Sequence, residues 1–569
     1  MRRWTTPLVR HGHARSVCTA ASQLEGAAAA THPQAKRTIT ATITSLDEDG
    51  DAIGYDASAP VHTNRPLRVP FAVPGDTLAV QVWNKDLVRS DFTSAMFAQL
   101  ETIEQPSEHR VEPLCSKFFG ICGGCKHQNV RYAEQLEQKQ RRVESMFTDR
   151  GIPVTEPIRR IQGVESEGDA GLYRYRNKME FTCSTGRWML DDDKTEDEEV
   201  LPEFTLGLFP VASVSTRRAR TQKKRRNGRH REWNSRILSI DSCVLQDASC
   251  DWLLQRIRSL CEELNIKAYD FHTHDGFLKN VVLRRGTVGD DKEIMVGFVT
   301  TTLEGETEQQ QRLNQLVETL VRDFDLEQQT GNVVSIVQQV DEEALRHRRE
   351  TAAEKQRVLF GRDFMYDSIL GHHFEVSLDS FFQPNSTQAS QLYRVIQEQI
   401  VERMSEKKPI VWDLFCGVGS IGICMGPHVE RLIGFEIVDA AVEKARKNAE
   451  INGYTAEQMQ FRRLDLSNHW SEVESQLLTL AEDPATRPDL IIVDPPRAGL
   501  HKKLITLLTR LAPAQICYVS CNPETQVRDL ELLCCGETAP YSVEMVQPVD
   551  MLPHTPHLET VAWLERRHN

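Results

Sequence analysis

The sequence predicts a multidomain α/β protein with a small OB-like β-barrel at the N-terminus, a central α+β domain and a Rossmann-like domain at the C-terminus. Its 569 residues exceed what one hydrophobic core normally supports. Short apolar runs at 432–435, 490–493 and 516–519 end abruptly in polar residues or Pro, as buried parallel strands do. Residues 38–104 instead show short alternating runs separated by Gly and Pro, which favours a closed barrel.

The first segment, residues 1–37, has the composition of an organellar transit peptide. It is rich in Ala, Ser and Thr, and it has no acid before Glu25. Its early basic residues are Arg2, Arg3, Arg10 and Arg15. We therefore expect a mitochondrial protein, with a plastid or cytoplasmic location as the alternatives. A plain disordered tail is the other interpretation of the same segment.

Residues 38–105 form the predicted barrel. A turn at Pro74-Gly75-Asp76 separates two alternating runs, and a second turn follows residue 46. The pattern alone also fits an unrelated barrel that serves packing or partner binding.

The central domain, residues 106–389, opens with cysteines at the spacing of a metal site. Cys115, Cys122 and Cys125 share one glycine-containing loop, and Cys243 follows an apolar run far along the chain. Thiols this close in sequence can converge on a metal, and the fourth can arrive from a distant strand. Four thiolates suit either an iron–sulfur cluster or zinc. The 14 cysteines are scattered over a large chain, which argues against a disulfide scaffold.

Two charged runs interrupt the central domain. Residues 191–199 are acidic, and residues 217–231 are strongly basic. Such runs are commonly interaction tails, so the basic run is interpreted as an RNA contact; neutralisation of the acidic run and nuclear localisation stay open. The net charge of −14 decides little, because an RNA-binding face needs only a local basic patch. No apolar run approaches the roughly 20 residues of a membrane helix, so no membrane partner is expected.

The C-terminal domain, residues 390–569, carries the motifs of a ligand-binding sheet edge. A strand, a turn at Gly417 and Gly419 and a helix start follow one another, and Glu436 ends the next strand, where an acid can bond a ribose. This glycine turn fits several nucleotide cofactors. Asp494 and Cys521 follow two later strands and should reach the same edge. A buried, unreactive thiol is the alternative for Cys521.

Six motifs together resemble the S-adenosylmethionine-dependent RNA uracil-C5 methyltransferases, from about residue 38 to the C-terminus. They are DLFCGVGSIGI, GFEIV, KARKNAEINGY, DPPRAG, VSCNPET and HTPHLETVAWL. The N-terminal barrel is similar to the TRAM domain of part of that family. In that subgroup a similar cysteine set holds a [4Fe–4S] cluster, and zinc is the alternative. The six residues between Cys115 and Cys122 depart from the spacing of about five that is expected there.

The resemblance also implies roles for individual residues. Uracil C5 is a weak nucleophile, so Cys521 would first add to C6, and Glu559 would later remove the C5 proton. Cofactor contacts would come from Gln383, Phe415, Ser420, Glu436, Asp465 and Asp494. Ser420 stands where relatives commonly have Asn.

The expected partner is RNA, either transfer or ribosomal, bound by a monomer. The YRNKMEF stretch of the family would supply phosphate contacts from Arg174, Arg176 and Lys178, and Phe381 would stack on an extruded base. Two other functions are considered. A DPPY-type amino methyltransferase would need an aromatic residue where Arg497 stands, and an RNA-binding chaperone would have no use for Cys521 and Glu559.

Overall fold

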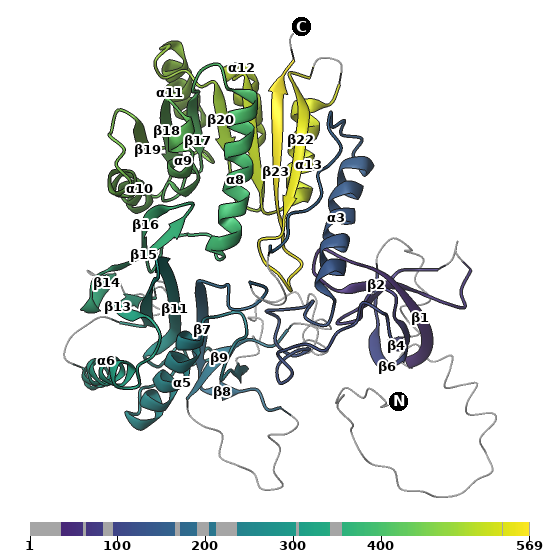
Figure 1. Ribbon diagram of the computed structural model, residues 1–569. Coiled ribbons are helices and arrows are strands. Elements are labelled where there is room, and N and C mark those ends of the chain that lie inside the picture. Colours follow the sequence, from purple (N-terminus) through teal and green to yellow (C-terminus); the bar gives the residue numbers. More distant parts are fainter. Residues whose placement is uncertain are drawn as a thin grey trace, which may run out of the picture.

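The computed structural model describes residues 36–60, 64–83, 95–165, 171–190, 204–211, 236–302, 307–341, 355–536 and 539–567. Figure 1 shows three bodies: a curled N-terminal sheet, a central sheet with helices, and a C-terminal α/β layer structure above them. The acidic run, the basic run and nearly all of the expected transit segment lie outside the described residues. Among the helices that are described, none is long and apolar enough to cross a membrane.

The N-terminal sheet has six strands in the order β5-β3-β2-β1-β4-β6. They are β1 (Lys36–Leu46), β2 (Ala52–Asp56), β3 (Leu67–Val69), β4 (Thr77–Trp83), β5 (Met96–Phe97) and β6 (Gln99–Gln105). Alternate residues of β1 and β4 are buried, as the sequence pattern predicts. The buried Asp76 carboxylate closes the Pro74-Gly75 turn by accepting from the backbone N–H groups of Val73 (2.7 Å) and Ser107 (2.9 Å). The pairing of the described strands ends at β5 and β6, so a closed barrel stays a prediction.

Helix α3 (Tyr132–Asp149) joins the N-terminal sheet to the C-terminal domain. The helical spacing of apolar residues predicts this helix. Val143 and Phe147 pack into the core on one face of the C-terminal sheet. The helix therefore belongs to the C-terminal layer structure, although it precedes the central sheet in sequence.

The central sheet has eight strands in the order β14-β13-β12-β11-β7-β9-β10-β8. Its strands are β7 (Lys178–Ser184), β8 (Gly186–Arg187), β9 (Thr205–Leu208), β10 (Arg236–Ser239), β11 (Leu278–Val288), β12 (Asp291–Thr300), β13 (Asn332–Val340) and β14 (Gln356–Gly361). Helices α5 (Ala248–Glu263) and α6 (Glu308–Leu326) share one core with the sheet. Residues Val282, Met295 and Val337 belong to a different core, which continues into the C-terminal domain.

A hairpin of β15 (Phe364–Ile369) and β16 (His372–Ser377) lies between the central sheet and the C-terminal domain. Met365 and Phe374 of the hairpin are buried in the core that the two domains share. Helix α8 (Ser386–Arg403) follows, and the Asn385 side chain caps it by accepting from the Gln388 N–H at 3.2 Å.

The C-terminal sheet has seven strands in the order β19-β18-β17-β20-β21-β23-β22. The first five in sequence, all parallel, are β17 (Ile410–Leu414), β18 (Arg431–Glu436), β19 (Met459–Arg463), β20 (Leu490–Val493) and β21 (Gln515–Ser520); β22 (Tyr541–Val549) and β23 (Glu559–Arg566) form an antiparallel end. Because β18 and β20 flank β17 on opposite sides, the strand order reverses there. Ligands of open α/β sheets bind at such a switch point, beside the carboxyl ends of the strands.

Helices cover both faces of this sheet, which confirms the Rossmann-like layer structure. On one face lie α8, α9 (Ser420–Met425) and α10 (Asp439–Ile451); on the other lie α11 (Trp470–Glu482), α12 (Lys502–Leu511), α13 (Pro523–Cys534) and α3. Alternate residues of β17 enter the two cores: Val411 packs on one face, and Trp412 packs on the other. The short strand is buried on both faces for this reason, and all its residues except Asp413 are apolar.

Candidate active site

The glycine turn after β17 wraps around the carboxylate of Glu436. Phe415, Gly417 and Gly419 have φ of 67°, 55° and 82°, so three residues of this turn are left-handed. A Cβ on Gly419 would lie 3.1 Å from the Phe461 ring. The Gly417 N–H donates to Glu436 Oε2 at 3.1 Å. Glu436 is thereby fixed at the carboxyl end of β18, beside the turn.

Asp465 lies at the same edge, one strand further out. The Leu464 N–H donates to the Glu436 carbonyl oxygen at 2.8 Å, which ties the ends of β18 and β19 together. The Asp465 carboxylate accepts from the Ser467 N–H (2.9 Å) and hydroxyl (2.6 Å) and from Asn468. Hydrogen bonds from Ser467 come first among the causes that lower the pKa of Asp465 to about 2, so it carries its charge at neutral pH.

Two other expected cofactor residues, Ser420 and Gln383, lie near helix α8: Ser420 contacts the helix, and Gln383 belongs to the segment just before it. The Ser420 hydroxyl, at the start of α9, is hydrogen-bonded to the Tyr393 hydroxyl of α8 at 2.9 Å. Gln383 is buried, and its carbonyl oxygen accepts from the Asn177 side chain at 2.7 Å. Gln383 is therefore attached to the central domain, whereas Ser420 belongs to the glycine turn.

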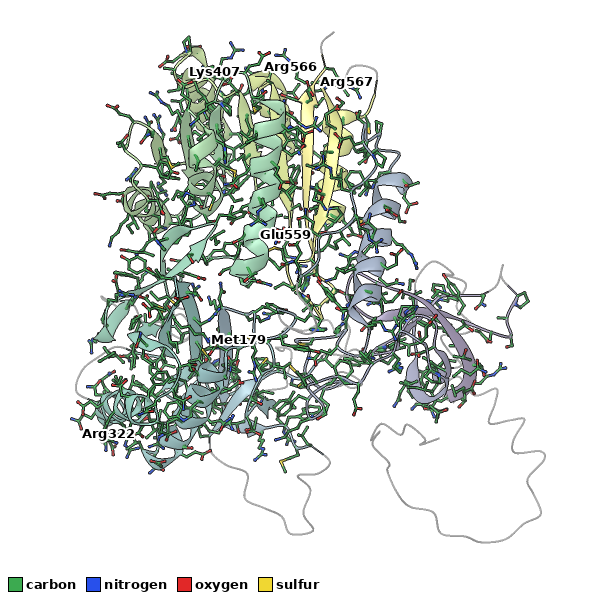
Figure 2. The ribbon with its side chains drawn as sticks, viewed as in Figure 1. Met179, Arg322, Lys407, Glu559, Arg566 and Arg567 are labelled. Atoms are coloured by element: carbon green, nitrogen blue, oxygen red, sulfur yellow. The ribbon has the colours of Figure 1, made fainter. Side chains whose placement is uncertain are left out.

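Cys521 and Glu559 leave the sheet from neighbouring strands. Ser520, the last residue of β21, is paired with Thr560 of β23 in antiparallel register, so Cys521 and Glu559 both lie one residue beyond that pair, at the same end of the two strands. Figure 2 shows Glu559 at the end of the C-terminal sheet that faces the central domain, where Met179 lies. A thiol and a carboxyl group from distant segments thus share one sheet edge.

Burial and neighbouring carboxylates raise the pKa of both groups. Burial raises the pKa of the Cys521 thiol to about 11, and Glu559 and Asp494 act in the same direction. Burial, followed by the charge of Asp494, also raises the pKa of Glu559 well above its ordinary value. The Arg497 guanidinium opposes both shifts. The Arg497 cation therefore favours the Cys521 thiolate, whereas negative charge on Glu559 or Asp494 disfavours it.

Asp413 is a buried carboxyl that sequence reasoning did not select. It is 1% exposed; Oδ2 accepts from the Gly422 N–H at 3.1 Å, and Oδ1 has no partner among the described residues. Burial and then the charge of Asp494 raise its pKa to about 8, and burial raises the pKa of Asp494 to about 7. The signal available in the sequence is an acid inside the apolar run 410–415.

The loop that carries Glu559 is fastened by α3 and by the chain before β7. His554, with φ of 65°, stacks on Tyr173 at 4.5 Å, and its N–H donates to the Gln135 side chain at 2.9 Å. The Tyr175 hydroxyl donates to the Pro553 carbonyl oxygen at 2.9 Å. The His127 N–H, two residues after Cys125, donates to the His554 carbonyl oxygen at 3.0 Å. The position of Glu559 therefore depends on segments more than 370 residues earlier in the chain.

The four expected metal-ligand cysteines line one cavity of about 490 Å³. They are Cys115, Cys122, Cys125 and Cys243. Burial raises the pKa of each thiol, to about 11 for Cys122 and about 12 for Cys125, and the charge of Arg176 opposes the shift for Cys122, Cys125 and Cys243. Within the described ranges, no group of three or more His, Cys, Asp or Glu side chains has the arrangement needed for one metal ion.

The expected phosphate-contact residues have different surroundings. Arg174 is occupied within the fold: it donates to the carbonyl oxygens of Cys243 (3.1 Å) and Gln246 (2.7 Å) and pairs with Asp251. Arg176 and Lys178 both line the four-cysteine cavity. Phe381 lines it as well and is 70% exposed.

Comparison with known proteins places this chain among the RNA methyltransferases. A family model described as tRNA (uracil-5-)-methyltransferase matches residues 310–567. An uncharacterized RNA methyltransferase of Chlorobaculum tepidum is 31% identical over 505 residues, 87% of this chain and 90% of the relative. Another, from Bacteroides thetaiotaomicron, is 30% identical over 506 residues, 88% of this chain and 96% of the relative.

A solved structure shares the fold over nearly the whole chain. It is the Pyrococcus abyssi tRNA (uracil-54, C5)-methyltransferase in complex with S-adenosyl-L-homocysteine, with a TM-score of 0.59 and 24% sequence identity over 92% of this chain and all of that chain. The protein is thus an RNA methyltransferase with a multidomain methyltransferase fold. It belongs to the tRNA (uracil-5-)-methyltransferase family.

Proposed function

We propose that this protein transfers a methyl group from S-adenosylmethionine to C5 of a uridine in transfer or ribosomal RNA, through a covalent adduct between Cys521 and uracil C6. The observation that carries the proposal is the register of β21 and β23, which sets a thiol beside a carboxyl group at the ligand-binding edge. A thiol and a base that act on the same ring are what this reaction needs.

The proposed reaction uses the site as follows. The Cys521 thiolate forms a bond to C6, and the electron pair of the C5–C6 double bond moves onto the ring as an enolate. S-Adenosylmethionine, when bound, would supply the electrophilic methyl group: C5 would take it up as the S–CH3 bond breaks, and S-adenosylhomocysteine would be the leaving group. Glu559 then accepts the C5 proton, and the C6–S bond breaks, which returns the thiolate. The raised pKa of Glu559 makes its carboxylate a stronger base than an exposed glutamate.

The proposed cofactor cradle is the glycine turn with the strand ends around it. Glu436 would bond the ribose hydroxyls, and Asp465 would accept from the adenine amine. The remaining contacts would come from Gln383, Phe415, Ser420 and Asp494. The geometry supports this, since the turn, Glu436 and Asp465 adjoin at one edge. Phe381, exposed at the neighbouring cavity, would stack on the extruded base.

The test is adduct formation with RNA that carries 5-fluorouridine. Fluorine cannot leave as a proton, so the complex should stall after methyl transfer and survive denaturing electrophoresis. Cys521→Ser should form no adduct; an equal amount of adduct would remove Cys521 from the mechanism. Glu559→Gln should methylate ordinary RNA but retain it on Cys521, whereas normal turnover would exclude Glu559 as the base.

We also propose a [4Fe–4S] cluster at the four cysteines, with zinc as the alternative. Four thiols lining one cavity, with Arg176 close enough to act on three of them, suit an anionic thiolate cluster. A cluster gives each thiolate its own iron, so the thiols lie further apart than around a single ion. Anaerobically purified protein should contain iron and sulfide. If the purified protein contained zinc instead, the cluster would be excluded and a zinc site would remain. If it contained no metal, the proposed metal site would be excluded.

The N-terminal sheet is proposed to be a TRAM-like RNA-binding barrel, and the protein to act as a monomer. If a variant lacking residues 36–105 bound RNA with the affinity of the unaltered protein, the first proposal would be contradicted. A sedimentation mass of two chains would contradict the second.

A further inference from the structure

Two cations face each other across strands β7 and β11. Lys178 is paired with Arg284 in the antiparallel register, so both side chains lie on the same face of the central sheet. Both line the four-cysteine cavity. Like charges directly opposite one another destabilise a sheet. The pair therefore lowers the stability of the folded protein, so a role other than folding is needed to explain it.

The charge of this pair is not balanced inside the protein. Arg284 is 2% exposed, and its Nη2 donates to the Ser380 carbonyl oxygen, but its Nε has no partner among the described residues. Lys178 is half-buried, and burial followed by the charge of Arg284 lowers its pKa. The acids that act on the two cations are Asp379, Glu180 and Asp367. Across the described ranges, no carboxylate forms an ion pair with either cation, and the Asp367 side chain is occupied by Asn177, Thr287 and Ser386.

The pair lies directly under the loop that approaches the active site. Arg284 bonds to Ser380, and the next residue is the exposed Phe381. Asn177, which precedes Lys178, donates its backbone N–H to the Pro384 carbonyl oxygen at 3.0 Å, and its side-chain amide donates to the Gln383 backbone carbonyl oxygen at 2.7 Å. An anion between the two cations would thus lie next to any base held by Phe381.

We infer that Lys178 and Arg284 form a binding site for one backbone phosphate of the RNA, next to the nucleotide that carries the target base. One phosphate oxygen would accept a hydrogen bond from the ammonium group of Lys178, and another would accept one from the Nε–H of Arg284. The anion would relieve the repulsion across β7 and β11. Arg176 lines the same cavity, and its charge acts on the thiols of Cys122 and Cys125. This inference rests on the proposed function.

The test compares salt dependence of RNA affinity in four variants. The probe is a fluorescein-labelled oligouridylate of about ten nucleotides, within the length one such site covers. Lys178→Gln should weaken binding and reduce the slope of log affinity against log salt by about 0.7, the value for one phosphate of a single strand. Lys178→Arg should keep the slope. Phe381→Ala should weaken binding about tenfold with the slope unchanged, because stacking releases no counterions.

Lys407→Gln is the matched control, because Lys407 lies at the far end of the C-terminal domain from Met179, the neighbour of Lys178 (Figure 2). Circular dichroism checks that Lys178→Gln is folded. An unchanged slope in Lys178→Gln, an equal change in Lys407→Gln, or no oligouridylate binding by the unaltered protein would overturn the phosphate site. Methylation of unmodified RNA is measured separately: its absence in the unaltered protein overturns the proposed function, whereas methylation with an unchanged Lys178→Gln slope overturns this site alone.

Discussion

Lys139 of α3 and Asp550, the residue after β22, form a buried ion pair: Nζ and Oδ1 are 2.6 Å apart, and the two side chains are 3% and 0% exposed. The Tyr132 hydroxyl donates to the other carboxylate oxygen at 2.9 Å. Taking two charges out of water is costly, and such additional hydrogen bonds help to offset the cost. The pair fixes α3 to the chain just before the loop that carries Glu559.

Lys139→Met should lower the free energy of unfolding by about 3–5 kcal/mol, because it leaves the Asp550 carboxylate buried without its cation. The double variant Lys139→Met with Asp550→Asn should recover much of this loss, since the amide is neutral and still accepts from Tyr132. Urea unfolding measures both. As the control, Arg141→Gln breaks an exposed pair with Glu137 and should cost under about 1 kcal/mol. Equal losses in the single and double variants would contradict the role of the charge.

Alkylation of Cys521 should be slow at neutral pH and should rise about tenfold per pH unit toward a pKa of about 11, because only the thiolate reacts. Iodoacetamide labelling, followed by mass spectrometry of the Cys521 peptide, measures the rate without RNA. Arg497→Gln should slow labelling at a given pH, since it removes the cation that favours the thiolate. Glu559→Gln should accelerate it. Shifts in the same direction for both variants would refute this electrostatic account.

Asp413 should contribute stability that is lost as pH rises from about 4 to about 8, because it holds its proton in the folded protein. Its folded pKa of about 8 lies above its ordinary 3.8, so the unfolded chain loses the proton first, and ionisation then favours unfolding. The contribution of this group is at most about 1.4 kcal/mol per pH unit. Asp413→Asn should flatten the slope of unfolding free energy against pH. Parallel curves for the variant and the unaltered protein would contradict the prediction.

Residues 1–37 are predicted to direct the protein to the mitochondrion. A reporter fused to this segment should enter the organelle and be cleaved before the N-terminal sheet, which begins at Lys36 in the structure. A fusion in which the four early arginines are replaced by Gln should stay in the cytosol. A cytosolic reporter with the unaltered segment would refute the prediction, and a nuclear full-length protein would direct attention to residues 217–231.

The sequence by itself determined several elements and the edge of the sheet at which the candidate site lies. Apolar runs at 490–493 and 516–519 predict β20 and β21, and both strands are present at those residues. The residues that follow parallel strands lie at one edge, so the sequence predicts that Asp494 and Cys521 share it. The left-handed backbone at Gly417 and Gly419 was likewise indicated by residue type. These features depend on neighbours in the chain, which a sequence shows directly.

Only the tertiary structure decided which distant residues meet. The insertion of β23 between β21 and β22 sets the register that brings Glu559 beside Cys521. Lys178 faces Arg284 across 106 residues, and Lys139 meets Asp550 across 411. The burial of Asp413, which sets its raised pKa, also follows from helices packed on both faces of the sheet. Strand register and desolvation depend on the whole packed core, so no local pattern in the sequence specifies them.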